Sequence, residues 1–203
     1  MPSSRRRTQE ERSAATRERL LQATFDALVE LGYARTSTPE VLRRSGVSRG
    51  ALLHHFPTKA DLVTAAVDFV FERQIAEYQE SFAGLSLDAE DRAAEAIELL
   101  WTKLSGDTFY AWLELIVAAR TEPVLLEKVR EVTRRFDQNA ASVREEMFPP
   151  PEESNPYYKV AVAFSFATLI GLGVTRIYEA EHRQRKVIKP LKMLARMVDP
   201  AGG

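Results

Sequence analysis

Residues 36–62 read TSTPEVLRRSGVSRGALLHHFPTKADL, and this stretch decides the fold. Ser37 and Glu40 have the Ser-x-x-Glu spacing in which each side chain caps the other's backbone amide at a helix start. In the alternative reading, Thr38 is the cap and Pro39 is the first helical residue. Either reading predicts a short helix that begins here.

The same stretch then predicts a turn and a second short helix. Gly46 ends the helix over residues 37–45, and Ser48 caps the next one, which runs to about His55. Two short helices separated by three residues that include a glycine are typical of a helix-turn-helix. The motif spans about residues 37–56.

The rest of the chain repeats apolar residues with helical period, and no run alternates convincingly between apolar and polar residues. We therefore expect an all-α protein. A basic arm over residues 1–13 is expected to be flexible, and a proline-rich connector covers residues 149–156. Further helices are expected over residues 16–31, 58–82, 89–104, 107–121, 124–148, 157–181 and from about 189, where Pro190 fits the first helical position.

Charge is divided unevenly along a chain of 203 residues whose formal net charge is only -1. Residues 1–60 hold eleven Lys or Arg against six acids, a local charge of +5, and the remainder carries −6. Such asymmetry suggests that the basic part has a polyanionic partner.

Composition excludes several classes of protein. The chain is 45% hydrophobic and 28% charged, as in ordinary globular proteins, and it has no cysteine, which excludes disulfides and thiolate zinc sites. The basic N-terminus lacks the apolar segment of a secretory signal. The apolar run Val160–Val174 is shorter than a membrane span and predicts a buried helix. We expect a cytoplasmic protein without a cofactor or bound metal.

The motif resembles the TetR family of transcriptional regulators. The sequences Gly46-Val47-Ser48 and His55-Phe56 match the family pattern in register, as do Gly50, Lys59 and Leu62. The chain departs from that pattern in two places, where Leu53 replaces the usual Tyr and Leu42 replaces the usual Ala.

The resemblance implies a three-helix DNA-binding domain over residues 14–60, extending to about 74, and a helical ligand-binding and dimerisation domain over residues 75–199. Arg49 at the start of a recognition helix can pair with guanine, and Ala51 can meet a thymine methyl group. The predicted DNA-binding residues are Arg5, Arg6, Arg7, Ser37, Thr38, Pro39, Ser48, Arg49, Gly50, Ala51, Leu53, His54, His55 and Lys59.

The acidic part of the chain offers a predicted pocket and a predicted interface. The family resemblance implies a ligand cavity, for which we name Trp101, Phe109, Trp112, Glu114, Ile116, Arg120 and Phe136. Small residues at intervals of four, followed by a second amphipathic helix, predict a four-helix contact between two copies. The residues named for this contact are Ala163, Ala167, Gly171, Val187, Leu191 and Leu194.

These patterns predict a homodimeric, ligand-responsive repressor that is released from a palindromic operator by a small molecule. The alternative is a helical small-molecule-binding or protein-interaction module that does not read DNA. An enzyme ranks third, because no nucleophile–base pair, metal cluster or phosphate loop is present in the sequence. The Arg5–Arg7 run can also be a solvated tail, and aromatic residues at helical spacing are more often core than pocket.

Overall fold

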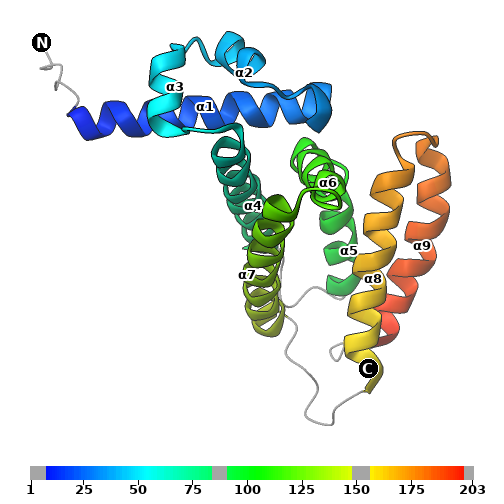
Figure 1. Ribbon diagram of the computed structural model, residues 1–203. Coiled ribbons are helices and arrows are strands. Elements are labelled where there is room, and N and C mark those ends of the chain that lie inside the picture. Colours follow the sequence, from blue (N-terminus) through cyan, green and yellow to red (C-terminus); the bar gives the residue numbers. More distant parts are fainter. Residues whose placement is uncertain (1–7, 84–90, 148–155, 199–203) are drawn as a thin grey trace, which may run out of the picture. The chain divides into compact units, whose positions relative to one another are not determined.

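The computed structural model describes residues 8–83, 91–147 and 156–198, without the side chains of residues 139–147, 156 and 158. Within these ranges the chain forms nine α-helices and one 3-10 helix and no strand, which confirms the all-α prediction (Figure 1). In chain order these are α1 (Gln9–Leu31), η1 (Tyr33–Arg35), α2 (Thr38–Ser45), α3 (Arg49–His55), α4 (Lys59–Ala83), α5 (Arg92–Lys103), α6 (Asp107–Ala119), α7 (Pro123–Met147), α8 (Pro156–Thr175) and α9 (Glu181–Val198).

The helices divide into two compact units. Unit 1 comprises residues 1–72 and 110–132, and unit 2 comprises residues 73–109 and 133–203. The division at residue 72 lies close to the domain boundary expected near residue 74. Residues 110–132, which the sequence analysis assigned to the second domain, are grouped with the N-terminal helices instead.

Unit 1 has a core formed by one face of each N-terminal helix. Leu20, Val41 and Leu52 are almost wholly buried, at 0%, 0% and 2% exposure, and each comes from a different helix. Burying such a side chain contributes about 1.5–3 kcal/mol. The same cluster contains Leu21, Ala23, Phe56, Leu62 and Ala66.

Helix starts in unit 1 follow local capping signals, although two expectations about them were wrong. α1 begins at Gln9 rather than near residue 16, because Thr8 and Glu11 form a capping box. The Ser37–Glu40 capping box does not form, since the Ser37 side chain makes no capping hydrogen bond. α4 also begins with a local cap, because the Thr58 hydroxyl accepts a 3.1 Å hydrogen bond from the Asp61 backbone N–H.

In unit 2, α8 and α9 lie side by side and both contact α5 (Figure 1). α8 passes very close to the end of α5, since a β-carbon on Gly173 would lie 2.3 Å from the backbone oxygen of Leu104. Only glycine permits this approach. The helix start expected near residue 189 is wrong, because α9 begins at Glu181 and continues through Pro190.

No helix in the described ranges combines the length and apolar character required to cross a membrane. The apolar run Val160–Val174, which was predicted to be a buried helix, lies within α8, but only part of it is buried. Ala161 and Leu169 are buried, whereas Val160 and Phe164 are exposed.

Candidate DNA-binding surface

α3 presents one apolar face to the core and a different face to solvent. The Ser48 hydroxyl caps the helix by accepting a 3.2 Å hydrogen bond from the Ala51 backbone N–H. Leu52 and Phe56, four residues apart, are 2% and 3% exposed and anchor the helix in unit 1. The exposed residues of this segment are Ser48, Arg49, Gly50, Leu53 and His54.

The turn before α3 is fixed by backbone geometry and by α1. Gly46 adopts the left-handed conformation with φ 63°, which favours glycine. The Arg19 guanidinium of α1 donates a hydrogen bond to the backbone oxygen of Ser45, at the end of α2. The Ser45 hydroxyl in turn accepts a 3.3 Å hydrogen bond from the Val47 backbone N–H. These contacts fix the direction of α3 relative to α1 and α2.

Gly50 leaves bare backbone at the first turn of α3. A β-carbon built at this position would meet no atom within 4 Å, so packing inside the chain does not require glycine here. A small residue on this face permits the close approach that a helix needs to enter a DNA groove. Together with exposed Arg49, it forms a surface suited to a partner outside the chain.

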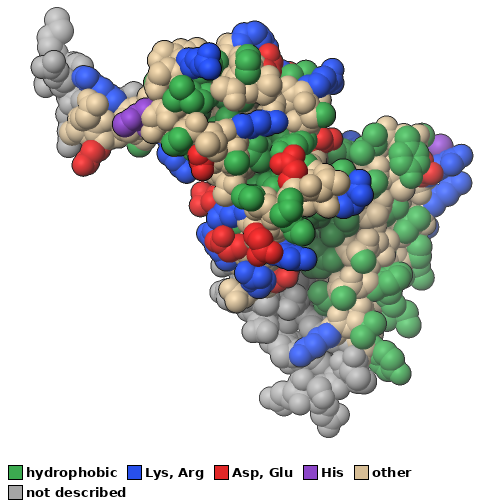
Figure 2. Space-filling view, in the orientation of Figure 1, with side chains coloured by type: hydrophobic (Ala, Val, Ile, Leu, Met, Phe, Trp, Pro, Cys, Tyr) green, Lys and Arg blue, Asp and Glu red, His purple; other side chains and the backbone are tan. Residues whose placement is uncertain are grey.

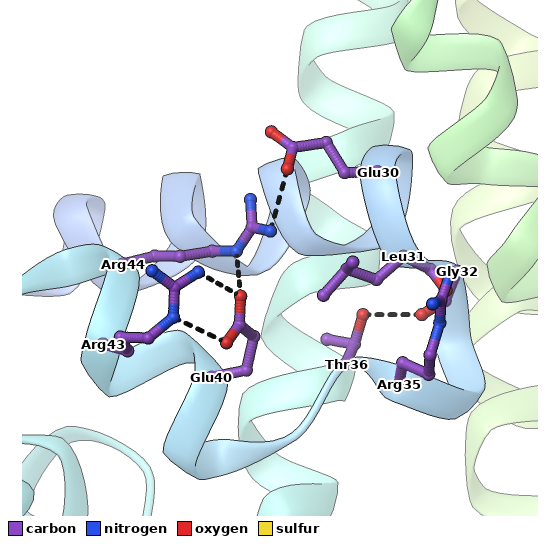
Figure 3. Close-up of polar contacts among 8 residues, drawn as sticks. All are labelled: Glu30, Leu31, Gly32, Arg35, Thr36, Glu40, Arg43 and Arg44. Carbon is purple, nitrogen blue, oxygen red and sulfur yellow. Dashed lines mark hydrogen bonds and ion pairs between the residues drawn. The ribbon is translucent and has the colours of Figure 1, made fainter.

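Two of the arginines in the basic part are neutralised by neighbouring carboxylates (Figure 3). Arg44 of α2 lies 2.8 Å from a Glu30 oxygen of α1 and 2.6 Å from a Glu40 oxygen. Arg43 makes a two-pronged contact with Glu40, at 2.8 and 2.6 Å. Hydrogen bonds from Arg43 and then Arg44 lower the pKa of Glu40 to about 2. This cluster joins α1 to α2 and offers little net charge to an anion.

The charges of Arg49 and Lys59, unlike those of Arg43 and Arg44, are not neutralised by a neighbouring carboxylate in the part of the chain that the structure describes. Neither makes an ion pair with a carboxylate within the described ranges. The Lys59 ammonium lies 5.2 Å from the centre of the Tyr33 ring. Two cations near the start of α3 and at the start of α4 are therefore available to an anionic partner.

The remaining predicted DNA contacts lie on either side of α3. Ser37 and Thr38 are half-buried and Pro39 is exposed at the start of α2. His54 and His55 are edge-to-face with ring centres 5.4 Å apart. Burial, followed by repulsion from His54 and Arg17, lowers the pKa of His55. Arg5, Arg6 and Arg7 lie outside the described residues.

Comparison with known proteins assigns this arrangement to a family. The family described as "Bacterial regulatory proteins, tetR family" matches residues 20–66. An uncharacterised HTH-type transcriptional regulator of Mycobacterium tuberculosis is 36% identical over 153 residues, which cover 70% of this chain and 78% of that protein. This chain belongs to the TetR family. TetR family proteins are DNA-binding transcriptional regulators and not enzymes.

Solved structures of other proteins share the fold. A transcriptional regulator from Rhodococcus sp. Rha1 superposes with a TM-score of 0.66 at 24% identity, over 90% of this chain and 95% of that one. The multidrug binding protein EbrR, complexed with ethidium, superposes with a TM-score of 0.59 at 21% identity, over 87% of this chain and 97% of that one. Identities this low show the fold alone.

Unit 2 of this TetR family protein contains a small cavity lined in part by aromatic side chains, which we call the aromatic cavity. It has a volume of about 30 Å³ and is lined by residues that include Tyr78, Phe109, Phe136 and Phe166. The Tyr78 and Phe136 rings pack edge-to-face, with centres 5.9 Å apart. Such a volume holds about one or two water molecules and is far below that of a drug-sized pocket. A larger ligand therefore requires these aromatic rings to move apart.

The predicted pocket residues do not gather in one place. Phe109 and Phe136 line the aromatic cavity, whereas Trp101 is 2% exposed in unit 2 and is not part of the lining. Trp112, Glu114, Ile116 and Arg120 all belong to unit 1. Helical spacing placed Trp112, Ile116 and Arg120 on one side of the helix expected over residues 107–121, but it did not indicate which part of that helix belongs to which unit.

Sequence reasoning missed two aromatic residues of this cavity, Tyr78 and Phe166. Tyr78 belongs to the apolar stripe of α4. The helical period of this stripe predicts that Tyr78 is buried, but it does not predict that Tyr78 lines a cavity. α8 is apolar around most of its circumference, and such a helix has no hydrophobic period from which the direction of Phe166 can be inferred.

An apolar face of α8 is exposed to solvent. Tyr157, Val160 and Phe164 are 72%, 63% and 54% exposed, and they follow the helical spacing i, i+3, i+7. Ala163, Ala167 and Gly171, the predicted small residues, are also exposed. Figure 2 shows hydrophobic side chains gathered along α8 and α9. The three larger residues were missed by the sequence analysis.

The predicted interface residues of α9 have different environments. Val187 is 40% exposed, whereas Leu191 is 3% exposed and packs inside unit 2. Leu194 is half-buried. Leu191 was predicted to contact a second copy, but it lies on the buried face of α9. There it faces the core of unit 2, as Ile188 does. The most exposed apolar side chains of α9 are Met193 and Met197.

Proposed function

We propose that this protein is a homodimeric repressor that binds a palindromic operator and is released by a small molecule. The observation that carries the proposal is the exposed first turn of α3, where Arg49 has no carboxylate partner in the described ranges and Gly50 leaves open space. In a recognition helix, the first turn is the part that contacts base edges in the major groove.

The contacts divide by their chemistry. Arg49 donates two hydrogen bonds to a guanine, and Ala51 and Leu53 give apolar contact to thymine methyl groups. Ser37, Thr38, Pro39, Ser48, His54, His55 and Lys59 contact the sugar–phosphate backbone and set the register of α3. Arg5, Arg6 and Arg7 extend this electrostatic attraction. A regulator with this DNA target acts in the cytoplasm.

The exposed apolar face of α8 supports a dimer of this protein. Tyr157, Val160 and Phe164 form a stripe that a second copy covers by helix-on-helix packing, beside the small residues Ala163, Ala167 and Gly171. A two-fold axis through this contact presents two copies of α3 to two half-sites. Val187 and Leu194 of α9 complete the proposed contact.

The aromatic cavity supports a ligand-dependent release. EbrR, which has the same fold, is a multidrug binding protein and has been crystallised in complex with ethidium. In this protein, an aromatic effector that enters between Tyr78 and Phe136 displaces α4 and α7, which line the cavity. α4 begins in unit 1 directly after α3, so its displacement changes the separation of the two recognition helices.

Selection of bound sequences from random duplex DNA tests this function. We expect an inverted repeat to be enriched, and Arg49→Ala to weaken binding to it by about 1–3 kcal/mol and to relax the preference at one base pair. Arg43→Ala is the matched control, because Glu40 already neutralises this arginine. Equal binding of the selected and scrambled duplexes by the unaltered protein would falsify the proposal.

A further inference from the structure

Unit 1 contains a second and larger cavity, with a volume of about 260 Å³, which we call the Lys59 cavity. Its lining comes from η1, from the first two turns of α4 and from the beginning of α7. None of its residues lines the aromatic cavity. It lies below the volume range of about 300–1,000 Å³ of drug-sized pockets, which indicates a small ligand.

Two side chains of opposite charge contact Tyr33 in this cavity. The Lys59 ammonium lies over the ring, 5.2 Å from its centre. The Glu122 carboxylate accepts a 2.7 Å hydrogen bond from the Tyr33 hydroxyl through Oε2. This bond positions the carboxylate and leaves Oε1 without a partner among the described residues. The cavity therefore offers one anchored negative group and one positive group.

The rest of the wall is apolar. Val63 and Leu125 are 6% and 3% exposed, and they form the buried part of the lining. Val124 also lines the cavity and is 67% exposed, so it presents an apolar surface at the opening. A ligand gains hydrophobic stabilisation by covering such a surface.

We propose that the Lys59 cavity binds a small zwitterionic acid with an apolar side chain, of the size and chemistry of an apolar amino acid. The ligand carboxylate pairs with Lys59, the ligand ammonium pairs with Glu122, and the side chain covers Val63 and Val124. A simple anion is repelled by Glu122, and a simple cation is repelled by Lys59. A zwitterion is attracted by both groups.

The position of Lys59 gives this binding a consequence for DNA. Lys59 is the first residue of α4 and is the proposed phosphate contact next to α3. A carboxylate bound to its ammonium competes with a DNA phosphate for the same charge. The ligand then weakens DNA binding from within unit 1. This second step rests on the proposed function, whereas the binding step does not.

Calorimetry with three matched probes tests the binding step. L-phenylalanine has both charges, 2-phenylethylamine lacks the carboxylate, and 3-phenylpropionate lacks the ammonium. We expect L-phenylalanine to bind at millimolar concentration or below, and each of the other two to bind about tenfold more weakly. Absence of L-phenylalanine binding at millimolar concentration, or equal affinity for all three probes, overturns the proposal.

Two variants assign the binding to this cavity. Lys59→Gln should weaken L-phenylalanine about tenfold and leave 2-phenylethylamine unaffected or tighter, and Glu122→Gln should remove the advantage of L-phenylalanine over 3-phenylpropionate. Lys186→Gln, an exposed charge on α9, is the control and should change nothing. Loss of binding in the control variant, or its retention in both cavity variants, contradicts the assignment.

The DNA step has its own readout. On a duplex selected from random DNA, L-phenylalanine should raise the apparent Kd of the unaltered protein and leave that of Lys59→Gln unchanged. Calorimetric binding without any effect on the Kd for DNA overturns the competition and leaves the cavity assignment standing. A protein that prefers no duplex contradicts the proposed function alone, because the calorimetric result is obtained without DNA.

Discussion

The backbone N–H of Tyr33 donates a 2.7 Å hydrogen bond to the side-chain carboxylate of Glu114. Tyr33 follows directly after the C-terminal cap of α1, and Glu114 lies on α6, 81 residues further along the chain. A 2.8 Å ion pair between Lys128 of α7 and Asp68 of α4 adds a further connection within unit 1. These contacts explain why residues 110–132 pack with the N-terminal helices.

We expect Glu114→Leu to destabilise the protein by about 1–3 kcal/mol, because it leaves the part-buried N–H of Tyr33 without its acceptor. The free energy of unfolding measured in urea checks this value. Glu114→Gln keeps an acceptor oxygen at the same position and should cost less than Glu114→Leu. Equal losses in the two variants would show that the hydrogen bond contributes nothing and that packing accounts for the effect.

The Glu40 cluster predicts an acid-dependent loss of stability. The pKa of Glu40 falls from an ordinary value of 4.5 to about 2 because Arg43 and Arg44 hydrogen-bond its charged form. A lowered pKa in the folded state means that the stabilisation is complete above pH 4.5 and is lost as the pH falls towards 2. The difference in unfolding free energy between the parent and Glu40→Gln should therefore shrink over this range.

High salt provides the control for this prediction. The Glu40–Arg43 ion pair lies at the surface, where the Arg43 side chain is 68% exposed, so added salt should screen it and reduce the difference at neutral pH. A difference that stays constant from neutral pH to pH 2 contradicts the assigned role of the two arginines.

Gln184 of α9 predicts a stabilising substitution. Its side chain is 0% exposed, and neither amide atom has a hydrogen-bond partner among the described residues. An unpaired buried polar group costs about 1–3 kcal/mol. Gln184→Met keeps the length of the side chain and removes the polar atoms, so we expect an unfolding free energy higher by about that amount. A lower value would show that the amide is paired in the folded protein.

Local signals in the sequence were sufficient for most of the helices. The Ser48 cap and the Gly46 stop were both predicted, because each depends on residues within four positions of one another. The Thr8–Glu11 capping box carried the same kind of signal but was overlooked in an arm expected to be flexible. Helix starts can thus be inferred from a few adjacent residues.

Features that depend on packing were not predictable in this way. Pro190 suggested a helix start, but Gln184, Ile188 and Leu191 form one buried stripe that extends across it. The burial of this stripe offsets the loss of one backbone hydrogen bond at proline. Similarly, Glu114 was predicted to line a ligand pocket. Its partner in the structure, the backbone N–H of Tyr33, is 81 residues away in the sequence and could not be inferred from neighbouring residues.

The exposed face of α8 gives the last prediction, which concerns the proposed dimer. Phe164 is 54% exposed in the isolated chain, within the stripe that begins at Tyr157. If a second copy covers it, Phe164→Glu places a charge in an apolar contact without a partner, which costs at least about 2 kcal/mol. Sedimentation should then show a dimer for the parent and a monomer for the variant at the same concentration.

Val117→Glu is the matched control, because Val117 is 59% exposed on α6 and lies outside this stripe. It should leave the dimer intact. The consequence for DNA follows from symmetry, since a monomer engages one half-site and loses the gain from binding two at once. Phe164→Glu should therefore weaken binding to an inverted repeat far more than binding to a single half-site. A monomeric parent protein, or equal dissociation by both variants, contradicts the assignment of this face.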